Sequence, residues 1–119
     1  MEYMIAFSEP ATEFARRNDP AHAPAYWGAW MAYIGAMEQA GIVVHGRGLQ
    51  PPETGTILRL RDGRREVQDG PHPDSKEQLG GFFIVTVPDL DTALEWAARS
   101  PAAAVGSVEV RPVLPPPSR

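Results

Sequence analysis

The chain has 119 residues, the usual size of a single domain, and its formal net charge is −4. It has no cysteine, which excludes disulfides and thiolate chemistry, and the arginines near residue 60 alternate with acidic residues, which argues against a nucleic-acid surface. No apolar stretch is long enough for a membrane helix and the start has no basic signal-peptide region, so we expect a cytoplasmic protein without a membrane partner.

The first half of the chain predicts a strand, a helix and a second strand. Residues 2–8 alternate, with Tyr3, Ile5 and Phe7 on one face, as in a β-strand. The remaining predicted segments are a polar, proline-containing loop with room for a helical turn over 9–24, a helix over 25–39 and a strand over 42–49. Glycines 46 and 48 interrupt this second strand, and glycine within a strand often marks a close approach of another chain segment.

The second half predicts a hairpin and a second strand–helix–strand unit. Residues 56–61 and 64–68 form the hairpin across Asp62-Gly63, a pair that favours the type I′ turn. The later elements are a strongly apolar strand over 82–87, a helix over 90–99 capped by Asp89 and closed by Pro101, and a last strand over 107–111. We therefore expect one domain over residues 1–113 and a loose, proline-rich tail over 114–119.

This order of elements specifies a fold. Without the inserted hairpin it is βαββαβ, two βαβ halves, which is the α+β ferredoxin-like topology with both helices on one face of an antiparallel sheet. Strand 82–87 is apolar on both sides, with Phe82 and Ile84 facing one way and Phe83 and Val85 the other. The second face of the sheet therefore needs a cover, and we expect a homodimer through this open face.

Several polar residues are candidates for a site. His45, followed by Arg47 on the second strand, could meet Asp69 across the sheet and act as a general base, although a structural histidine is the alternative. Segment 69–83 holds three acids, including Asp69 and Glu77, between turn-forming Gly and Pro residues, and could equally be only a turn leading into the next strand. Trp30 could wall a pocket between helix and sheet, or simply pack in the core.

The same sequence gives no reason to expect a metal or a cofactor. Histidines at metal-binding spacing, such as two on successive turns of a helix, are absent from the sequence. If the chain is an enzyme, the residues named above suit cofactor-free proton transfer or elimination best. The ligand-binding candidates are Trp30, His45, Arg47, Asp69 and Glu77, of which His45, Asp69 and Glu77 are the catalytic candidates.

Segment 69–83 resembles the signature of the YCII-related proteins, specifically the branch named for its Asp-Gly-Pro-Phe motif. The matching residues, in order, are Asp69-Gly70-Pro71, Ser75-Lys76-Glu77 and Leu79-Gly80-Gly81-Phe82, and further similarity includes Val87-Pro88-Asp89-Leu90-Asp91 and Val108-Glu109-Val110-Arg111-Pro112. His72 stands where this branch usually has Phe. The resemblance extends over nearly the whole chain and implies a bacterial protein with a dimeric α+β barrel fold.

The resemblance implies little about activity. Related proteins include a dehydrochlorinase thought to use a His–Asp pair whose His lies on the first helix, but residues 25–39 contain no His, so that pair cannot be transferred. Two hypotheses follow. The first is a domain that binds a small molecule between sheet and helices, with lyase-like or isomerase-like acid–base activity. The second is a non-catalytic dimeric accessory or regulatory protein, because relatives are often encoded near alternative sigma factors.

Overall fold

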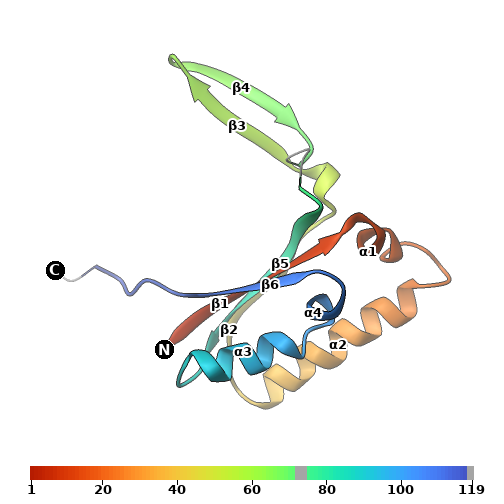
Figure 1. The fold of residues 1–119 in the computed structure, drawn as a ribbon, viewed down its shortest axis with the longest axis vertical. Helices are drawn as coiled ribbons and strands as arrows, with labels where there is room; N and C mark the ends of the chain where they lie inside the picture. The colour runs from red at the N-terminus through yellow and green to blue at the C-terminus, as the bar shows by residue number, and fades with distance from the viewer. Residues whose placement is uncertain (72–74, 118–119) are drawn as a thin grey trace.

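The computed structural model describes residues 1–71 and 75–117 (Figure 1). Its elements are β1 (Glu2–Pro10), α1 (Ala11–Arg16), α2 (Ala23–Gln39), β2 (Val43–Gly48), the 3-10 turn η1 (Pro52–Thr54), β3 (Thr56–Arg61), β4 (Arg64–Asp69), β5 (Glu77–Thr86), α3 (Leu90–Ala98), α4 (Pro101–Val105) and β6 (Ser107–Pro112). His72, the residue that departs from the family signature, lies outside the described residues. Within the described part of the chain, no helix is both long and apolar enough to cross a membrane.

The main sheet has the strand order expected for a ferredoxin-like fold. The order is β2-β5-β1-β6, and each neighbouring pair is antiparallel. Helices α2 and α3 lie on the same side of this sheet (Figure 1). The core between sheet and helices is formed by Tyr3, Ile5, Phe7, Tyr26, Trp30, Tyr33, Met37, Val85, Val87, Ala93, Ala97 and Ala102. The predicted α+β class and ferredoxin-like topology are therefore confirmed.

Several element boundaries differ from the prediction. Strand β1 continues to Pro10 because β5 begins at Glu77, earlier than expected, and supplies the partners of its last residues. Segment Ala11–Arg16 forms a short helix within the region where the sequence left room for a helical turn. Pro101 does not merely end a helix; it opens α4, because proline is well suited to the first turn of a helix.

The hairpin forms a separate two-stranded sheet that projects from the main body (Figure 1). Asp62 and Gly63 have φ values of 52° and 76°, so both central turn residues adopt the left-handed conformation that a type I′ turn needs. On one face of the hairpin, Leu58 and Val67 are paired and 52% and 59% exposed. This arm therefore carries an apolar face that the described residues do not cover.

The main sheet also has one open face. Met4 pairs with Ile84 and Ala6 pairs with Phe82, and strand alternation turns these four side chains away from the helices. Helices α2 and α3 lie on the other side (Figure 1). Apolar residues of β5 thus lie on both faces of the sheet, and α2 and α3 cover only one of these faces.

Candidate functional site

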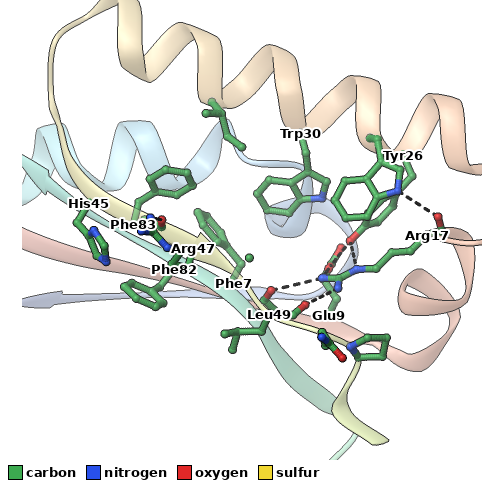
Figure 2. Close-up of a pocket in the computed structure, with 18 of the residues that line it drawn as sticks. Phe7, Glu9, Arg17, Tyr26, Trp30, His45, Arg47, Leu49, Phe82 and Phe83 are labelled. Carbon is green, nitrogen blue, oxygen red and sulfur yellow. Dashed lines mark hydrogen bonds and ion pairs between the residues drawn. The ribbon is translucent and has the colours of Figure 1, made fainter. Parts of the chain in front are cut away.

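A cleft of about 840 Å³ opens between α2 and the strands β2 and β5 (Figure 2). Helix α2 contributes one stripe to it, because residues four apart lie on the same helix face; the stripe consists of Tyr26, Trp30, Ile34 and Glu38. The facing strands contribute glycines at positions 46, 48, 80 and 81. The absence of side chains at these positions leaves space beneath the helix.

Two of these glycines leave room for side chains from neighbouring parts of the chain to pack against the strand backbone. A Cβ atom at Gly46 would overlap the ring of Phe83, which lies directly against the strand. A Cβ atom at Gly80 would lie 3.1 Å from both the Arg17 guanidinium and the Phe14 ring. The glycines that interrupt the strands in the sequence therefore allow an aromatic ring and a guanidinium group to approach the backbone closely.

The inner wall of the cleft is aromatic (Figure 2). The rings of Phe7 and Trp30 meet edge to face, with centroids 4.9 Å apart, and the Phe7 and Phe83 centroids are 6.3 Å apart. Trp30 is 9% exposed, and its indole nitrogen Nε1 has no hydrogen-bond partner among the described residues. Trp30 therefore serves both as core packing and as a wall of the cleft.

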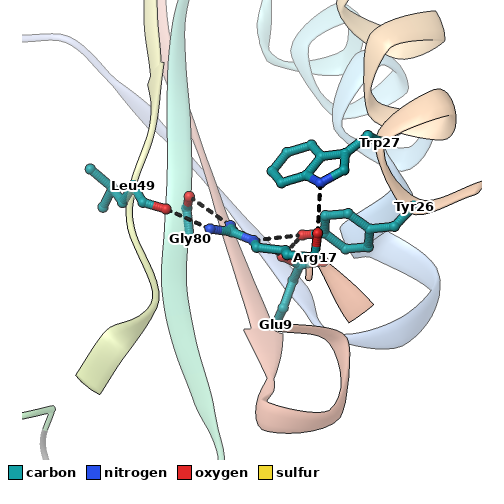
Figure 3. Close-up of polar contacts among 6 residues, drawn as sticks. All are labelled: Glu9, Arg17, Tyr26, Trp27, Leu49 and Gly80. Carbon is teal, nitrogen blue, oxygen red and sulfur yellow. Dashed lines mark hydrogen bonds and ion pairs between the residues drawn. The ribbon is translucent and has the colours of Figure 1, made fainter. Parts of the chain in front are cut away.

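One end of the cleft is a buried polar cluster of Glu9, Arg17 and Tyr26 (Figure 3). The Tyr26 hydroxyl donates to Glu9 Oε1 at 2.8 Å and accepts from Arg17 Nε at 3.2 Å. Arg17 Nη2 is 4.0 Å from Glu9 Oε1, and Glu9 is only 2% exposed. The tyrosine hydroxyl thus links an acid and a base that are both largely withdrawn from solvent.

Arg17 joins three separate parts of the chain at this point (Figure 3). Its Nη1 donates to the carbonyl of Leu49 at 2.6 Å, just after β2, and its Nη2 donates to the carbonyl of Gly80 in β5 at 3.4 Å. Its own carbonyl accepts from Trp27 Nε1 at 3.1 Å, and its guanidinium lies 4.8 Å from the Phe14 ring centroid. These contacts fix the polar end of the cleft.

Burial sets the protonation behaviour of the cluster. Desolvation raises the pKa of Glu9 above its ordinary value, with Glu13 adding to the rise, while the hydrogen bond from Tyr26 and the charge of Arg17 oppose it. Burial also raises the pKa of Tyr26. In the neighbouring core, burial raises the pKa of Tyr33 to about 12, and its hydroxyl donates to the Trp96 carbonyl at 2.9 Å. Tyr26 and Tyr33 are therefore neutral hydroxyls at physiological pH.

Of the five site residues predicted from the sequence, three line the cleft and two do not. Trp30, His45 and Arg47 all line the cleft (Figure 2). Trp30 lies on the helix side of the sheet. His45 and Arg47, on the edge strand β2, pair with Ile84 and Phe82 and therefore belong to the open face. The His45 ring lies 6.2 Å from the Phe82 ring centroid, and Arg47 Nη1 donates to the neighbouring Gly46 carbonyl.

Asp69 and Glu77 lie elsewhere. The expectation that His45 meets Asp69 across one sheet is wrong, because β4 pairs with β3 in a separate two-stranded sheet, where Asp69 lies opposite Thr56. Glu77 accepts a hydrogen bond of 2.6 Å from the hydroxyl of Ser107. Neither acid lines the cleft.

The residues that sequence reasoning missed are Glu9, Arg17 and Tyr26. The first two belong to segment 9–24, whose polar composition and three prolines favour a loop with room for a helical turn. A signal was nevertheless present: Glu9 continues the odd-numbered, inward-facing positions of the first strand, and Tyr26 lies one helical turn before Trp30. An acid in such an inward position needs a partner on a neighbouring element.

No group of three metal-binding side chains of the His, Cys, Asp or Glu type gathers anywhere in residues 1–71 and 75–117. What the cleft does offer is a hydrophobic wall with hydrogen-bonding groups at one end. This arrangement suits a small organic molecule with an apolar body and a polar head.

Comparison with known proteins agrees with this fold. An uncharacterised protein of Rhizobium meliloti (strain 1021) is 40% identical over 67 residues, which is 55% of this chain and 54% of that relative, so the match spans about half the relative's length. The solved structure of a 5-chloro-2-hydroxyhydroquinone dehydrochlorinase from Burkholderia phenoliruptrix AC1100, in complex with 2,5-dihydroxybenzoquinone, is similar in fold at 14% identity and a TM-score of 0.56, over 96% of this chain and 94% of that one. The profile of the YCII-related domain matches residues 1–116, and the chain therefore belongs to the YCII-related family.

Proposed function

We propose that the chain binds a small, planar, mainly apolar molecule in the cleft between α2 and the strands β2 and β5. The observation that carries this proposal is a cleft of about 840 Å³ whose wall is aromatic and whose end holds buried polar groups. Small-molecule sites in proteins typically have volumes of roughly 300–1,000 Å³, apolar linings and a few converging polar groups. The quinone complex of the dehydrochlorinase, a protein of similar fold, supports a planar ring as ligand.

The chemistry that the polar end suits is proton transfer without a cofactor, of the lyase or isomerase type. Glu9 is the group for this role, because burial raises its pKa and the Tyr26 hydroxyl bonds one of its oxygens. His45, at the open-face end of the cleft, is a second titratable group. In this proposal Glu9 takes the acid–base role that was expected from the sequence for His45 with Asp69 or Glu77.

A planar probe that cannot ionise tests the binding proposal. We expect 2-methoxynaphthalene to bind the wild type and Ile34→Trp to bind it at least about tenfold more weakly, because the added indole occupies the cleft. Met31→Trp is the matched control, since Met31 is on the same helix, is 66% exposed and does not line the cleft. Equilibrium binding by fluorescence, with thermal unfolding to check the fold, gives the comparison.

Two outcomes would count against this proposal. Equal weakening by both tryptophan variants would place the probe outside the cleft. A wild type that binds no probe would favour the accessory role instead, for which the exposed apolar face of the projecting hairpin, with Leu58 and Val67, is the supporting observation.

We also propose that two copies of the chain associate through the open face of the sheet. The support is the apolar centre of that face, formed by Met4, Ala6, Phe82 and Ile84. A face of this kind packs readily on its own copy about a two-fold axis, sheet against sheet.

A charge placed in that face should separate the copies. We expect Ile84→Asp to halve the mass measured by light scattering after gel filtration, because an unpaired carboxylate buried at the interface is strongly unfavourable. Leu94→Asp is the control, since Leu94 is 47% exposed on α3, on the other side of the sheet. A wild type with the mass of a single chain would contradict the dimer.

A further inference from the structure

Two polar groups in the cleft lack hydrogen-bond partners among the described residues, and one of them is fully buried. Trp30 Nε1 is a donor without an acceptor. Glu9 accepts a hydrogen bond from Tyr26 at Oε1, whereas its second oxygen, Oε2, accepts none from residues 1–71 and 75–117. A buried donor is nearly always paired, so the unmatched Trp30 nitrogen requires an explanation, and the Glu9 oxygen in the same cleft is an acceptor that a ligand can reach.

The two groups belong to one corner of the cleft. Tyr26 and Trp30 are one helical turn apart on α2, and the Tyr26 hydroxyl is 2.8 Å from the Glu9 carboxylate. Figure 2 shows the nitrogen of the Trp30 indole on the edge of the ring that faces Tyr26. This nitrogen has almost no exposed surface, so contact with a ligand atom requires the indole to turn toward the cleft.

We infer that the ligand of this cleft carries a ring hydroxyl, a phenol or an enol, which donates to Glu9 Oε2 and accepts from Trp30 Nε1. A hydroxyl offers a donor and an acceptor on one atom, which complements the two unmatched groups. An ether or a ketone would leave Oε2 unsatisfied, and a carboxylate would be repelled by ionised Glu9. The inference rests on the proposed function and specifies the class of ligand.

The hydroxyl contact should depend on pH through Glu9. The charged and titratable groups that face Glu9 are Glu13 from α1, Arg17 from the segment after it and Tyr26 from α2. Protonated Glu9 can no longer accept at both oxygens as a carboxylate does. Burial raises the pKa of Glu9, so this carboxylate takes up its proton earlier than an exposed glutamate when the pH is lowered. The affinity for a hydroxyl ligand should therefore begin to fall before the pH reaches the range in which an exposed glutamate titrates.

A matched pair of probes isolates the hydroxyl. 2-Naphthol and 2-methoxynaphthalene share the ring and the oxygen, but only the naphthol can donate a hydrogen bond. At neutral pH we expect the wild type to bind 2-naphthol at least about tenfold more tightly, as a hydrogen bond to a charged acceptor warrants. We expect Glu9→Gln to reduce this preference to about threefold or less. We expect Trp30→Phe to weaken both probes, because both probe oxygens can accept from Nε1, whereas Glu95→Gln, on α3, leaves both affinities unchanged.

The outcomes separate the inference from the proposed function. Equal affinity of the wild type for the two probes would overturn the inference while leaving the cleft as a binding site. Binding of neither probe would overturn both. A preference for 2-naphthol that persists in Glu9→Gln, or that stays constant toward acid pH in the wild type, would show that Glu9 is not the acceptor and would overturn the inference as well.

Discussion

Arg17→Met should lower the free energy of unfolding by about 3–5 kcal/mol at neutral pH, the range observed when one partner of a buried ion pair is removed. The guanidinium lies within a buried cluster, with side-chain exposures of 10% for Arg17 and 2% for Glu9. Its loss leaves the Glu9 carboxylate without a nearby positive charge. It also removes the hydrogen bonds to Tyr26, Leu49 and Gly80 that join three parts of the chain.

The loss of stability in Arg17→Met should be smaller at acid pH than at neutral pH. The folded state holds the Glu9 proton more tightly than the unfolded state, because burial raises the pKa of this carboxyl. Stability therefore falls as pH rises from the unfolded carboxyl pKa through the raised folded value, and it is regained below that window. In Arg17→Met the lowering effect of the Arg17 charge is gone, so the pKa rises further and the window widens toward neutral pH.

Urea unfolding at acid and neutral pH measures both effects. Arg16→Met is the matched control, because Arg16 is adjacent, half exposed and paired with Glu13 on its own helix. This substitution should change stability by less than about 0.5 kcal/mol. The double variant Glu9→Gln/Arg17→Met should recover part of the loss. If Arg17→Met were as stable as Arg16→Met, the polar cluster would not hold the end of the cleft.

Gly106→Ala should cost about 1–3 kcal/mol, the usual cost of inserting atoms into a packed region. A Cβ at this position would overlap the carbonyl oxygen of Ser8. Neither segment can easily move away, because Ser8 pairs with Ser107 in the main sheet and the Gly106 amide donates to the Ala102 carbonyl at 2.8 Å. The strain would fall on the backbone beside Glu9.

Gly35→Ala is the control for this substitution. No described atom outside the adjoining stretch of α2 lies within 4 Å of a Cβ at Gly35. Because the residue is inside this helix, alanine should stabilise the protein by about 0.5–1 kcal/mol through helix propensity. Thermal or urea unfolding of the two variants should show changes of opposite sign. A Gly106→Ala protein with wild-type stability would contradict the close packing of β6 against β1.

Patterns of short range were enough to predict the fold. Alternation at Tyr3, Ile5 and Phe7 gave the central strand, and the Asp62-Gly63 pair gave the turn type, because each depends on neighbouring residues. The ferredoxin-like order then followed from the alternation of strands and helices. The early start of β5 was not predicted, because Gly80 and Gly81 resemble a turn unless their contacts with Arg17 and Arg47 are known.

The site depends on contacts that local patterns do not show. Arg17 bonds to Leu49 and Gly80, which are 32 and 63 residues away in the chain. Glu9 is buried only because a loop and a helix close over the end of its strand. At Asp69 the sequence predicted a contact that the fold does not make. The hairpin that carries Asp69 forms its own two-stranded sheet, so Asp69 does not lie beside His45 in the main sheet.

The three tryptophans provide the most direct test of the cleft as a binding site. Trp27 and Trp30 line the cleft, whereas Trp96 lies outside it with the Arg99 guanidinium 4.2 Å from its ring. In a titration of ¹⁵N-labelled protein with 2-naphthol, followed by NMR, we expect the indole N–H signals of Trp27 and Trp30 to shift while that of Trp96 stays in place. Equal shifts of all three signals, or no shift at Trp27 and Trp30, would contradict a binding site between α2 and the β2–β5 edge.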